Sequence, residues 1–176
     1  MTSVKKNIYI ITLILLILDQ LIKYAVTSGL TLHQEVVLIP DFFSLQYAQN
    51  TGAAWSLLEG NVFLLIVISV VAVIALNQYL LHETKFSKCS IWAYGLIMGG
   101  ILGNLVDRLI HEYVIDYLSF QIFEYHFPIF NLADTAIVIG IVLLTIDIVR
   151  SEIYDRRKRR QSSTTRSVSS AKIRNQ

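Results

Sequence analysis

The segment IWAYGLIMGGILGNLVDRLI, residues 91–110, has the length and composition of a membrane-spanning helix. A helix that rises 1.5 Å per residue needs about 20 residues to cross a hydrocarbon core of about 30 Å. No charged residue occurs in the segment before Asp107. Four glycines recur along it at small-xxx-small spacing: Gly95, Gly99, Gly100 and Gly103. Such spacing lets a neighbouring helix approach closely, so the segment predicts a transmembrane helix packed against others.

Three further apolar stretches, residues 7–26, 62–81 and 129–149, have similar lengths. The chain of 176 residues is 54% hydrophobic and has only two prolines, which is too apolar for a soluble domain of this size. The first stretch follows a basic N-terminus, as the core of a secretory signal would, but Asp19 and Lys23 interrupt it before any small-residue cleavage site. We therefore predict an all-α membrane protein with four transmembrane helices, the first of them retained.

Basic residues are concentrated on one side of this topology. The loops at 27–61 and 111–128 contain no Lys or Arg, whereas the N-terminus, the connection between helices two and three, and the C-terminus are basic. Because basic segments stay in the cytoplasm, we predict that both termini are cytoplasmic and that the two loops lie outside.

Two segments outside the helices have a distinct composition. Residues 155–176 are basic, rich in Ser and Thr and poor in apolar residues, so we expect a disordered cytoplasmic tail after a four-helix membrane domain of residues 1–154. In the first outer loop, residues 36–39 and 42–47 are rich in β-formers and flank Pro40-Asp41, which predicts a hairpin. We expect this hairpin to form a small β-rich extracytoplasmic platform.

Polar residues within the apolar segments form pairs whose spacing puts both members on one helix face. The pairs are Asp19 with Lys23, Asn104 with Arg108, and Asn131 with Asp134. With a rise of 1.5 Å per residue, these pairs lie at similar depth in the outer third of the membrane, where the helices can bring them together. One interpretation is purely structural, with interhelical hydrogen bonds and an Asp–Arg ion pair stabilising the bundle.

Asp116 in VIDY, residues 114–117, and Asp134 in FNLAD, residues 130–134, favour a chemical role. A charged carboxylate at membrane depth costs at least about 3 kcal/mol, and Arg108 alone cannot neutralise two of them. Two neighbouring carboxyls resist double ionisation, so one stays protonated while the other acts as a base, and such a dyad can activate water against an amide. The pair predicts acid–base chemistry at a membrane surface and leaves open which aspartate carries the proton.

Other chemistries have little support in the sequence. Cys89 stands alone, the four histidines form no HExxH-type ligand pair, and no Gly-x-Ser-x-Gly motif or glycine-rich phosphate loop occurs. We therefore expect no metal, no other cofactor and no nucleic-acid partner.

Five sequence blocks follow one another along nearly the whole chain. They are LDQLIK at 18–23, NTGAAW at 50–55, GGILGNLVDR at 99–108, VIDY at 114–117 and FNLAD at 130–134. In this order they resemble the bacterial lipoprotein signal peptidases, also called signal peptidase II. The chain departs from that pattern at Tyr117, where Phe is common, and at Thr135, where Ser is common.

The resemblance implies a multi-pass aspartyl endopeptidase of the bacterial cell membrane. It would cleave signal peptides from prolipoproteins immediately before a diacylglyceryl-modified cysteine, with Asp116 and Asp134 as the catalytic dyad toward the extracytoplasmic face. Supporting or substrate-binding roles are expected for Asp19, Lys23, Asn50, Gly52, Asn104, Asp107, Arg108 and Asn131. The partners would be lipidated prolipoproteins and membrane lipid, and the enzyme would act as a monomer.

Within this set we expect Arg108 and Asn104 to tune or position the dyad. Asn50 or Asn131 is expected to donate to the developing oxyanion. The outer hairpin would cover the bound peptide.

Two alternatives belong to other classes of protein. A small proton-coupled transporter or channel subunit also carries polar residues on facing helices, although transporters place their sites near the midplane and are built from repeats. A noncatalytic scaffold would use the aspartates only to hold helices together. Substitution of each aspartate by asparagine separates these hypotheses, because a scaffold keeps its role whereas a protease loses turnover.

Overall fold

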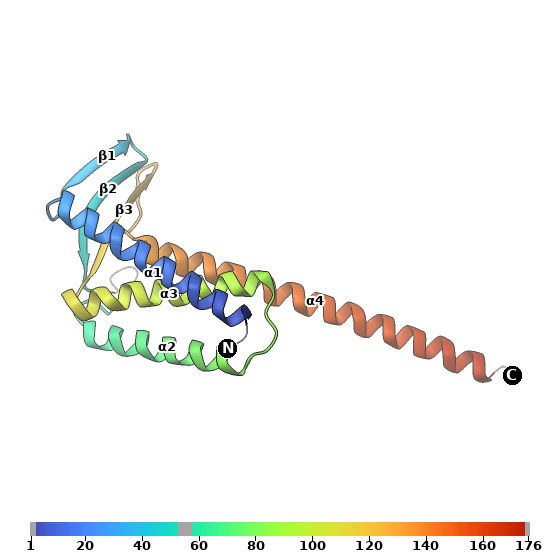
Figure 1. Ribbon diagram of the computed structural model, residues 1–176. Helices are drawn as coiled ribbons and strands as arrows, with labels where there is room; N and C mark the ends of the chain where they lie inside the picture. The colour runs from blue at the N-terminus through green and yellow to red at the C-terminus, as the bar shows by residue number, and fades with distance from the viewer. Residues whose placement is uncertain (1–2, 53–57, 175–176) are drawn as a thin grey trace.

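The structure is a computed structural model and describes residues 3–52 and 58–174 of the chain. In this part of the chain the elements follow one another as α1, β1, β2, α2, α3, β3, β4 and α4. The helices lie side by side, and the strands form a sheet at one end of the bundle (Figure 1). The two ends of the chain both lie away from the sheet (Figure 1).

The four predicted apolar helices are confirmed. They are α1 (Ser3–Gly29), α2 (Val62–His82), α3 (Lys88–His111) and α4 (Leu132–Arg174). Each is long and apolar enough to cross a membrane, counting α4 as far as Arg156. Large apolar side chains face outward, such as Phe63 on α2, which is 80% exposed. Hydrocarbon rather than water suits such a surface, since large exposed apolar areas are rare on soluble monomers.

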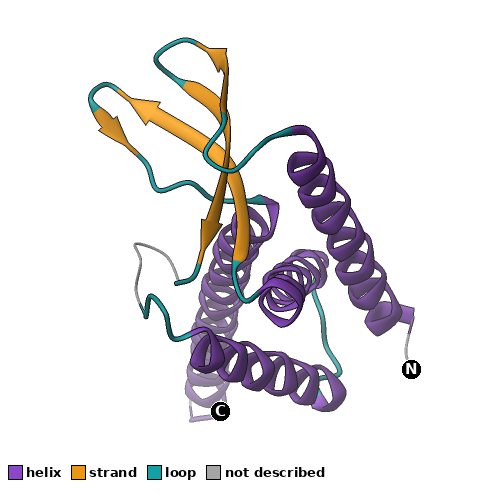
Figure 2. Cartoon of the chain, turned by 90° about the vertical axis from the view of Figure 1, so that its left-hand side faces the viewer, coloured by secondary structure: helices purple, strands orange, loops and turns teal. Residues whose placement is uncertain are grey.

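Helix α3 lies between the other three helices (Figure 2). Its glycines allow the close approach that the sequence predicts. A Cβ atom at Gly99 would lie 2.8 Å from Leu15 of α1. A Cβ atom at Gly103 would lie 2.6 Å from a carboxylate oxygen of Asp19, which also belongs to α1. Gly100 faces Ala133 of α4. Small residues on α3 therefore hold α1 and α4 close to it.

The sheet is antiparallel with strand order β1-β2-β3-β4. Its strands are β1 (Glu35–Ile39), β2 (Phe43–Asn50), β3 (Val114–Ile122) and β4 (Tyr125–His126). The predicted hairpin is confirmed as β1 and β2, whose tight connection contains Asp41 with a positive φ of 58°.

The β-rich platform that is expected in the first outer loop extends beyond that loop. The segment after α3 adds β3 and β4 to the same sheet. Pairing with β3 satisfies the backbone N–H and C=O groups along one edge of β2. The two strands lie far apart in the sequence, so no local turn predicts their pairing. Asp116 therefore sits on a strand, and Ala48 of β2 is its partner in the register.

The sheet is anchored on the helices by an apolar cluster. Val26 at the end of α1 packs with Tyr47 of β2 and with Ile115 and Tyr117 of β3, and all four side chains are buried. This contact fixes β3, and with it Asp116, against the end of the bundle.

Helix α4 continues to Arg174, where the sequence predicts a disordered tail from residue 155. The segment contains few helix breakers, and the first turn beyond the apolar part carries an i,i+4 ion pair between Glu152 and Arg156. Low hydrophobicity prevents this stretch from packing in a core, but it does not prevent a helix from continuing.

Candidate active site

Asp116 and Asp134 meet where β3 and the start of α4 come together. The carboxylate of Asp116 accepts hydrogen bonds from Asn50 Nδ2 at 2.9 Å and from Asn131 Nδ2 at 2.7 Å. Asp116 is 2% exposed, whereas Asp134 is half-buried. The carboxylate of Asp134 accepts from Asn104 Nδ2 at 2.7 Å and from the backbone N–H of Asn131 at 3.2 Å. Asn131 therefore contacts both carboxylates.

Asp134 also belongs to the cap of α4. Asn131 is the N-cap residue, because its side-chain oxygen accepts the N–H of Asp134 at 2.9 Å while Asp134 accepts the N–H of Asn131. This reciprocal pair is a capping box with an aspartate as its third helical residue. The cap places Asp134 at the positive end of the helix dipole, which favours its ionised form.

The other free N–H groups at the start of α4 are also satisfied by side chains. Leu132 N–H donates to the Tyr117 hydroxyl at 3.2 Å, and Ala133 N–H donates to Asp19 at 3.1 Å. The first turn of a helix leaves four N–H groups without intrahelical partners, and burying them requires such acceptors. Strand β3 and helix α1 thus fix the position from which Asp134 projects.

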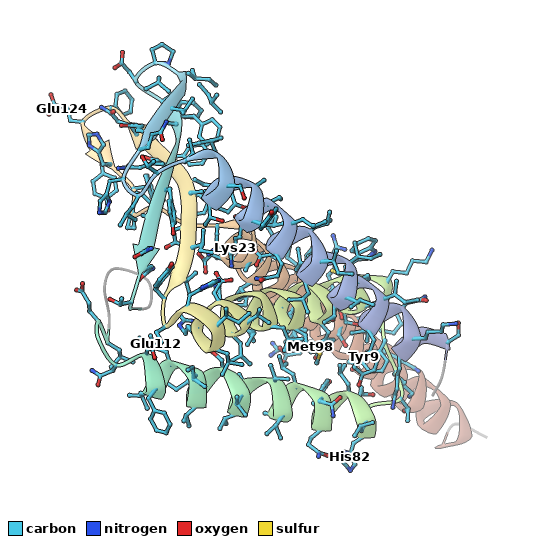
Figure 3. All side chains as sticks on the ribbon, turned by 60° about the vertical axis from the view of Figure 1, so that its left-hand side comes forward. Tyr9, Lys23, His82, Met98, Glu112 and Glu124 are labelled. Carbon is cyan, nitrogen blue, oxygen red and sulfur yellow. The ribbon has the colours of Figure 1, made fainter. Side chains whose placement is uncertain are left out.

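A buried charge cluster lies behind the carboxylate pair. The ammonium group of Lys23 lies 2.8 Å from Asp19 and 2.8 Å from Asp107, and all three side chains are at most 1% exposed. Figure 3 shows Lys23 in the interior, near the point where the sheet meets the helices. Lys23 also donates to Asn104 Oδ1 at 3.1 Å. This bond turns the amide of Asn104 so that its nitrogen faces Asp134.

The same cluster reaches Asp116 through the backbone. Asp107 accepts the N–H of Ile115 at 3.0 Å, which ties β3 to α3 one residue before Asp116. Asn131 Nδ2 also approaches Asn104 Oδ1 at 3.1 Å and the Ile115 carbonyl at 3.3 Å. In the described part of the chain, no buried side-chain nitrogen or oxygen lacks a hydrogen-bond partner. The network is therefore fully satisfied, as a rigid buried polar site requires.

Burial raises the pKa of the Asp116 carboxyl to about 7, and the nearby charge of Asp134 adds to this effect. Hydrogen bonds from Asn50 and Asn131 act in the opposite direction and are weaker. Asp116 can therefore hold a proton at neutral pH.

The purely structural interpretation of the sequence pairs Arg108 with an aspartate, but the structure gives Arg108 a different partner. Its guanidinium donates to the Gly52 carbonyl at 3.0 Å, and the Gly52 N–H donates to Asn50 Oδ1 at 2.9 Å. Among the described residues, the buried ion pairs involve Lys23 and not Arg108. Arg108 thus holds the chain next to Asn50. Ala53, Ala54 and Trp55 of the same sequence block lie outside the described residues.

All ten residues expected from the sequence are brought together at this end of the bundle, and the network contains two more. Gln20 donates to Asp107 at 2.9 Å and to the Gly103 carbonyl at 3.2 Å. The sequence signal that could have identified Gln20 is its position, since it is a polar residue next to Asp19 within an apolar segment. Tyr117 acts through its hydroxyl at the cap of α4, a contact that Phe could not make.

The two carboxylates open on a cleft of about 860 Å³. Asn50, Asn104 and Arg108 line its polar part. The remaining wall is largely apolar and is contributed by the connection before α4, including Phe127 and Phe130, and by Val138 and Ile139 of α4. A cleft with a polar end and a long apolar wall suits an amphiphilic ligand. Among the described residues, no group of three or more His, Cys, Asp and Glu could hold a metal ion.

The fold and the site define a class: helical membrane proteins with a pair of carboxylates in a cleft at one end of the bundle. The chain matches the family model described as Signal peptidase (SPase) II over residues 11–150. It is 42% identical over 145 residues to the lipoprotein signal peptidase of Halothermothrix orenii, which covers 82% of this chain and 97% of that protein. The lipoprotein signal peptidase of Bacillus subtilis is 34% identical over 141 residues, with 80% and 92% covered.

A solved bacterial membrane enzyme, determined by the in meso method at 2.3 Å resolution, has the same architecture. Its TM-score is 0.78 at 30% identity, with 84% of this chain and 90% of that chain covered. The chain belongs to the signal peptidase II family.

Proposed function

We propose that the protein is a membrane aspartyl endopeptidase that removes signal peptides from diacylglyceryl-modified prolipoproteins, cutting immediately before the lipidated cysteine. The observation that carries this proposal is the pair of carboxylates, Asp116 and Asp134, held by shared asparagines at the polar end of an apolar cleft. Family membership supports the substrate class, since the relatives are lipoprotein signal peptidases.

In the proposed mechanism the dyad holds one proton. We place it on Asp116, because burial raises the pKa of this carboxyl to about 7, and we assign the role of base to Asp134 at the helix N-terminus. Asp134 accepts a proton from the attacking water as Asp116 donates one to the scissile carbonyl oxygen. Collapse of the tetrahedral intermediate returns a proton to the leaving nitrogen and breaks the C–N bond.

Asn50 is the better of the two candidate oxyanion donors. Its side-chain nitrogen carries two hydrogens, of which one is used by Asp116, and the residue lines the cleft. Asn131 is fully buried, and its side-chain nitrogen already has three acceptors. We assign Asn131, Asn104 and Lys23 to positioning the dyad.

Recognition of the lipid is proposed to occur on the apolar wall of the cleft. Each methylene group of an acyl chain contributes about 0.8 kcal/mol when it leaves water, so a diacylglyceryl group supplies most of the binding free energy. The hairpin of β1 and β2 would cover the peptide, because β2 ends at Asn50 beside the dyad. Residues of the cleft wall would then hold the scissile bond next to the two carboxylates.

The proposed location is the bacterial cell membrane, with both termini cytoplasmic and the sheet at the extracytoplasmic surface. Basic residues at the chain ends and in the connection between α2 and α3 support this orientation. We propose that a single copy, without a cofactor, is the active unit.

The test compares two forms of one purified prolipoprotein, with and without the diacylglyceryl group, in detergent containing a chelator and no nucleotide. We expect cleavage of the lipidated form only, with the new N-terminus at the modified cysteine when the products are analysed by mass spectrometry. Equal cleavage of both forms would contradict lipid-dependent recognition. Absence of cleavage by the folded protein would contradict the peptidase assignment.

A further inference from the structure

One carboxylate in the wall of the cleft has no part in the proposed mechanism. Glu59 lines the cleft together with Asn50, Arg108 and the two aspartates of the dyad. It belongs to the connection between β2 and α2, which lies at the sheet end of the bundle (Figure 1). The residue is exposed, so a ligand in the cleft can reach its charge.

A tight turn presents Glu59 to the cleft. The Asn61 N–H donates to the Leu58 carbonyl at 3.0 Å, which closes a four-residue turn with Glu59 as its second residue. The third residue, Gly60, has a positive φ of 78°, which favours glycine at this place in a turn. Asn61 also accepts the N–H of Leu65, so the turn leads directly into α2. Glu59 thus projects from a backbone that is fixed at the start of a helix.

In the described part of the chain, no cation forms an ion pair with Glu59. The ion pairs there involve Lys23 and Arg156. Residues 53–57 contain neither Lys nor Arg. The guanidinium of Arg108, which also lines the cleft, donates to a backbone carbonyl at 3.0 Å. The charge of Glu59 is therefore available to a ligand.

Glu59 gives the cleft a net negative charge. In the proposed mechanism the dyad keeps one proton, so the positive charge of Arg108 offsets its single negative charge. None of the other described residues that line the cleft is Lys, Arg or His. Lys23 is occupied by two buried aspartates. The outer segments do not compensate Glu59 either, because residues 27–61 and 111–128 contain six acidic residues and no Lys or Arg.

The direction of the substrate decides which part of it meets Glu59. A signal peptide keeps its basic end in the cytoplasm, and its apolar part crosses the membrane. The residues after the cleavage site are then outside, and in the proposed orientation Glu59 lies on that side as well. Acyl chains would occupy the apolar wall, so the polar end of the cleft is left to the peptide.

We propose that Glu59 determines specificity for the mature part of the substrate, favouring a basic residue and disfavouring an acidic one directly after the lipidated cysteine; this inference rests on the proposed function. Glu59 touches no reacting atom in this proposal and is not a catalytic residue. A solvated carboxylate attracts a cation and repels an anion only weakly. The expected effect is therefore a preference among substrates and not an absolute requirement.

The experiment measures kcat/KM for three lipidated prolipoproteins that differ only in the residue after the cysteine, which is Lys, Gln or Glu. An uncharged detergent excludes effects of lipid charge. In wild type, kcat/KM should be about threefold to tenfold higher for the Lys substrate than for the Glu substrate, as expected for one solvated attraction gained and one repulsion avoided. Glu59→Gln should bring the three values together, and Glu59→Lys should reverse their order. Thermal unfolding checks that both variants are folded.

The matched control is Glu124→Gln, which removes the same charge from the turn between β3 and β4, at a residue that does not line the cleft. Salt at physiological ionic strength screens exposed charges beyond about 8 Å, so this control should keep the wild-type order. Equal kcat/KM on the Lys and Glu substrates in wild type, or an order that persists in Glu59→Lys, would overturn the proposal. The same change in the control as in Glu59→Gln would overturn it too. So would a loss of equal size on all three substrates in folded Glu59→Gln.

Failure of the proposed function is distinguishable from failure of this inference. If wild type cleaves none of the three lipidated substrates, the peptidase assignment fails. If wild type cleaves all three with equal kcat/KM, only the specificity proposal fails.

Discussion

At the scale of single residues, asparagine side chains control the two carboxylates. Asn131 caps α4, contacts Asp116 and fixes the backbone before Asp134. Asn104 donates to Asp134 because its oxygen is already bound by Lys23. Asparagine supplies both a donor and an acceptor, so it can connect a cation to a carboxylate without adding charge. The buried lysine thus acts on the dyad through a neutral neighbour.

The protonation state of Asp116 makes a prediction about pH. Its carboxyl has a pKa raised to about 7, so the protonated form declines as the pH rises through this value. Because the proposed mechanism needs that proton, kcat/KM should fall about tenfold per pH unit above 7. Initial rates of cleavage between pH 6 and 9 measure this. A constant rate across that range would show that a protonated Asp116 is not required.

The charge cluster makes a prediction about stability. Lys23→Met leaves the buried carboxylates of Asp19 and Asp107 without their cation, and breaking a buried ion pair in this way costs about 3–5 kcal/mol. The thermal midpoint of the purified protein in detergent should therefore drop strongly. Lys88→Met, at an exposed position at the start of α3, should leave the midpoint nearly unchanged. A similar midpoint in both variants would contradict a stabilising role of the cluster.

The sequence predicts which polar residues meet at this end of the bundle, because their spacing on helices is informative. Asp19, Lys23, Asn104 and Arg108 lie on helical faces that turn inward at one depth, and this convergence can be worked out from 1.5 Å per residue. The partners of Arg108 could not be predicted, because Gly52 lies in a loop whose path depends on the sheet. The hydroxyl of Tyr117 contributes to a cap that exists only once β3 meets α4.

At the scale of elements, α3 is the helix on which the bundle packs. Its glycines bring α1 and α4 near enough for Asp19 to accept the N–H of Ala133 across the interface. Gly103 matters most for the site, because it faces the carboxylate of Asp19.

A prediction for this element follows from the missing Cβ atom. In Gly103→Ala the new Cβ would lie 2.6 Å from Asp19 Oδ2 and 3.3 Å from the Ala133 Cβ, so α1 or α4 must move. Overpacking of this kind costs about 1–3 kcal/mol. Thermal unfolding should show a lower midpoint, together with slower cleavage. Gly29→Ala is the matched control, since no atom lies within 4 Å of its new Cβ. Equal midpoints for both variants would contradict the packing argument.

Elements with local signals were predicted and those with distant partners were not. The hairpin of β1 and β2 is marked by Pro40-Asp41 between two runs of β-formers. Strand β3 pairs with β2 across more than sixty residues, as Asn50 with Val114 illustrates, and no turn marks that pairing. The continuation of α4 beyond residue 155 shows that polarity alone is a poor signal for the end of a helix.

At the scale of the whole molecule, the polar sites occupy the two ends of an apolar bundle. The carboxylate pair and its cleft lie where β3 meets the start of α4, and a smaller cavity lined by Tyr79, Tyr94 and Asp147 lies where α2, α3 and the middle of α4 meet. Both ends of the chain also lie away from the sheet.

The proposed orientation makes a prediction about accessibility in cells. In a Cys89→Ser background, a cysteine placed at Glu124 near the tip of the sheet should react with a membrane-impermeant maleimide in intact spheroplasts. A cysteine at Lys85, in the connection between α2 and α3, should react only after the membrane is opened. Labelling of the Lys85 position in intact cells would contradict the proposed topology.

The central claim is that Asp116 and Asp134 together cleave the peptide bond, and the direct measurement is the turnover rate of purified Asp116→Asn and Asp134→Asn on a diacylglyceryl-modified prolipoprotein. Each variant keeps the shape of the side chain and an acceptor for one of its two hydrogen bonds, and thermal unfolding checks that it is folded. Asp41→Asn, in the exposed turn between β1 and β2, is the control and should retain the wild-type rate. We predict a loss of at least about a thousandfold in each site variant, since both halves of an acid–base pair are needed. A folded variant of either aspartate that turns over at the wild-type rate would contradict the dyad.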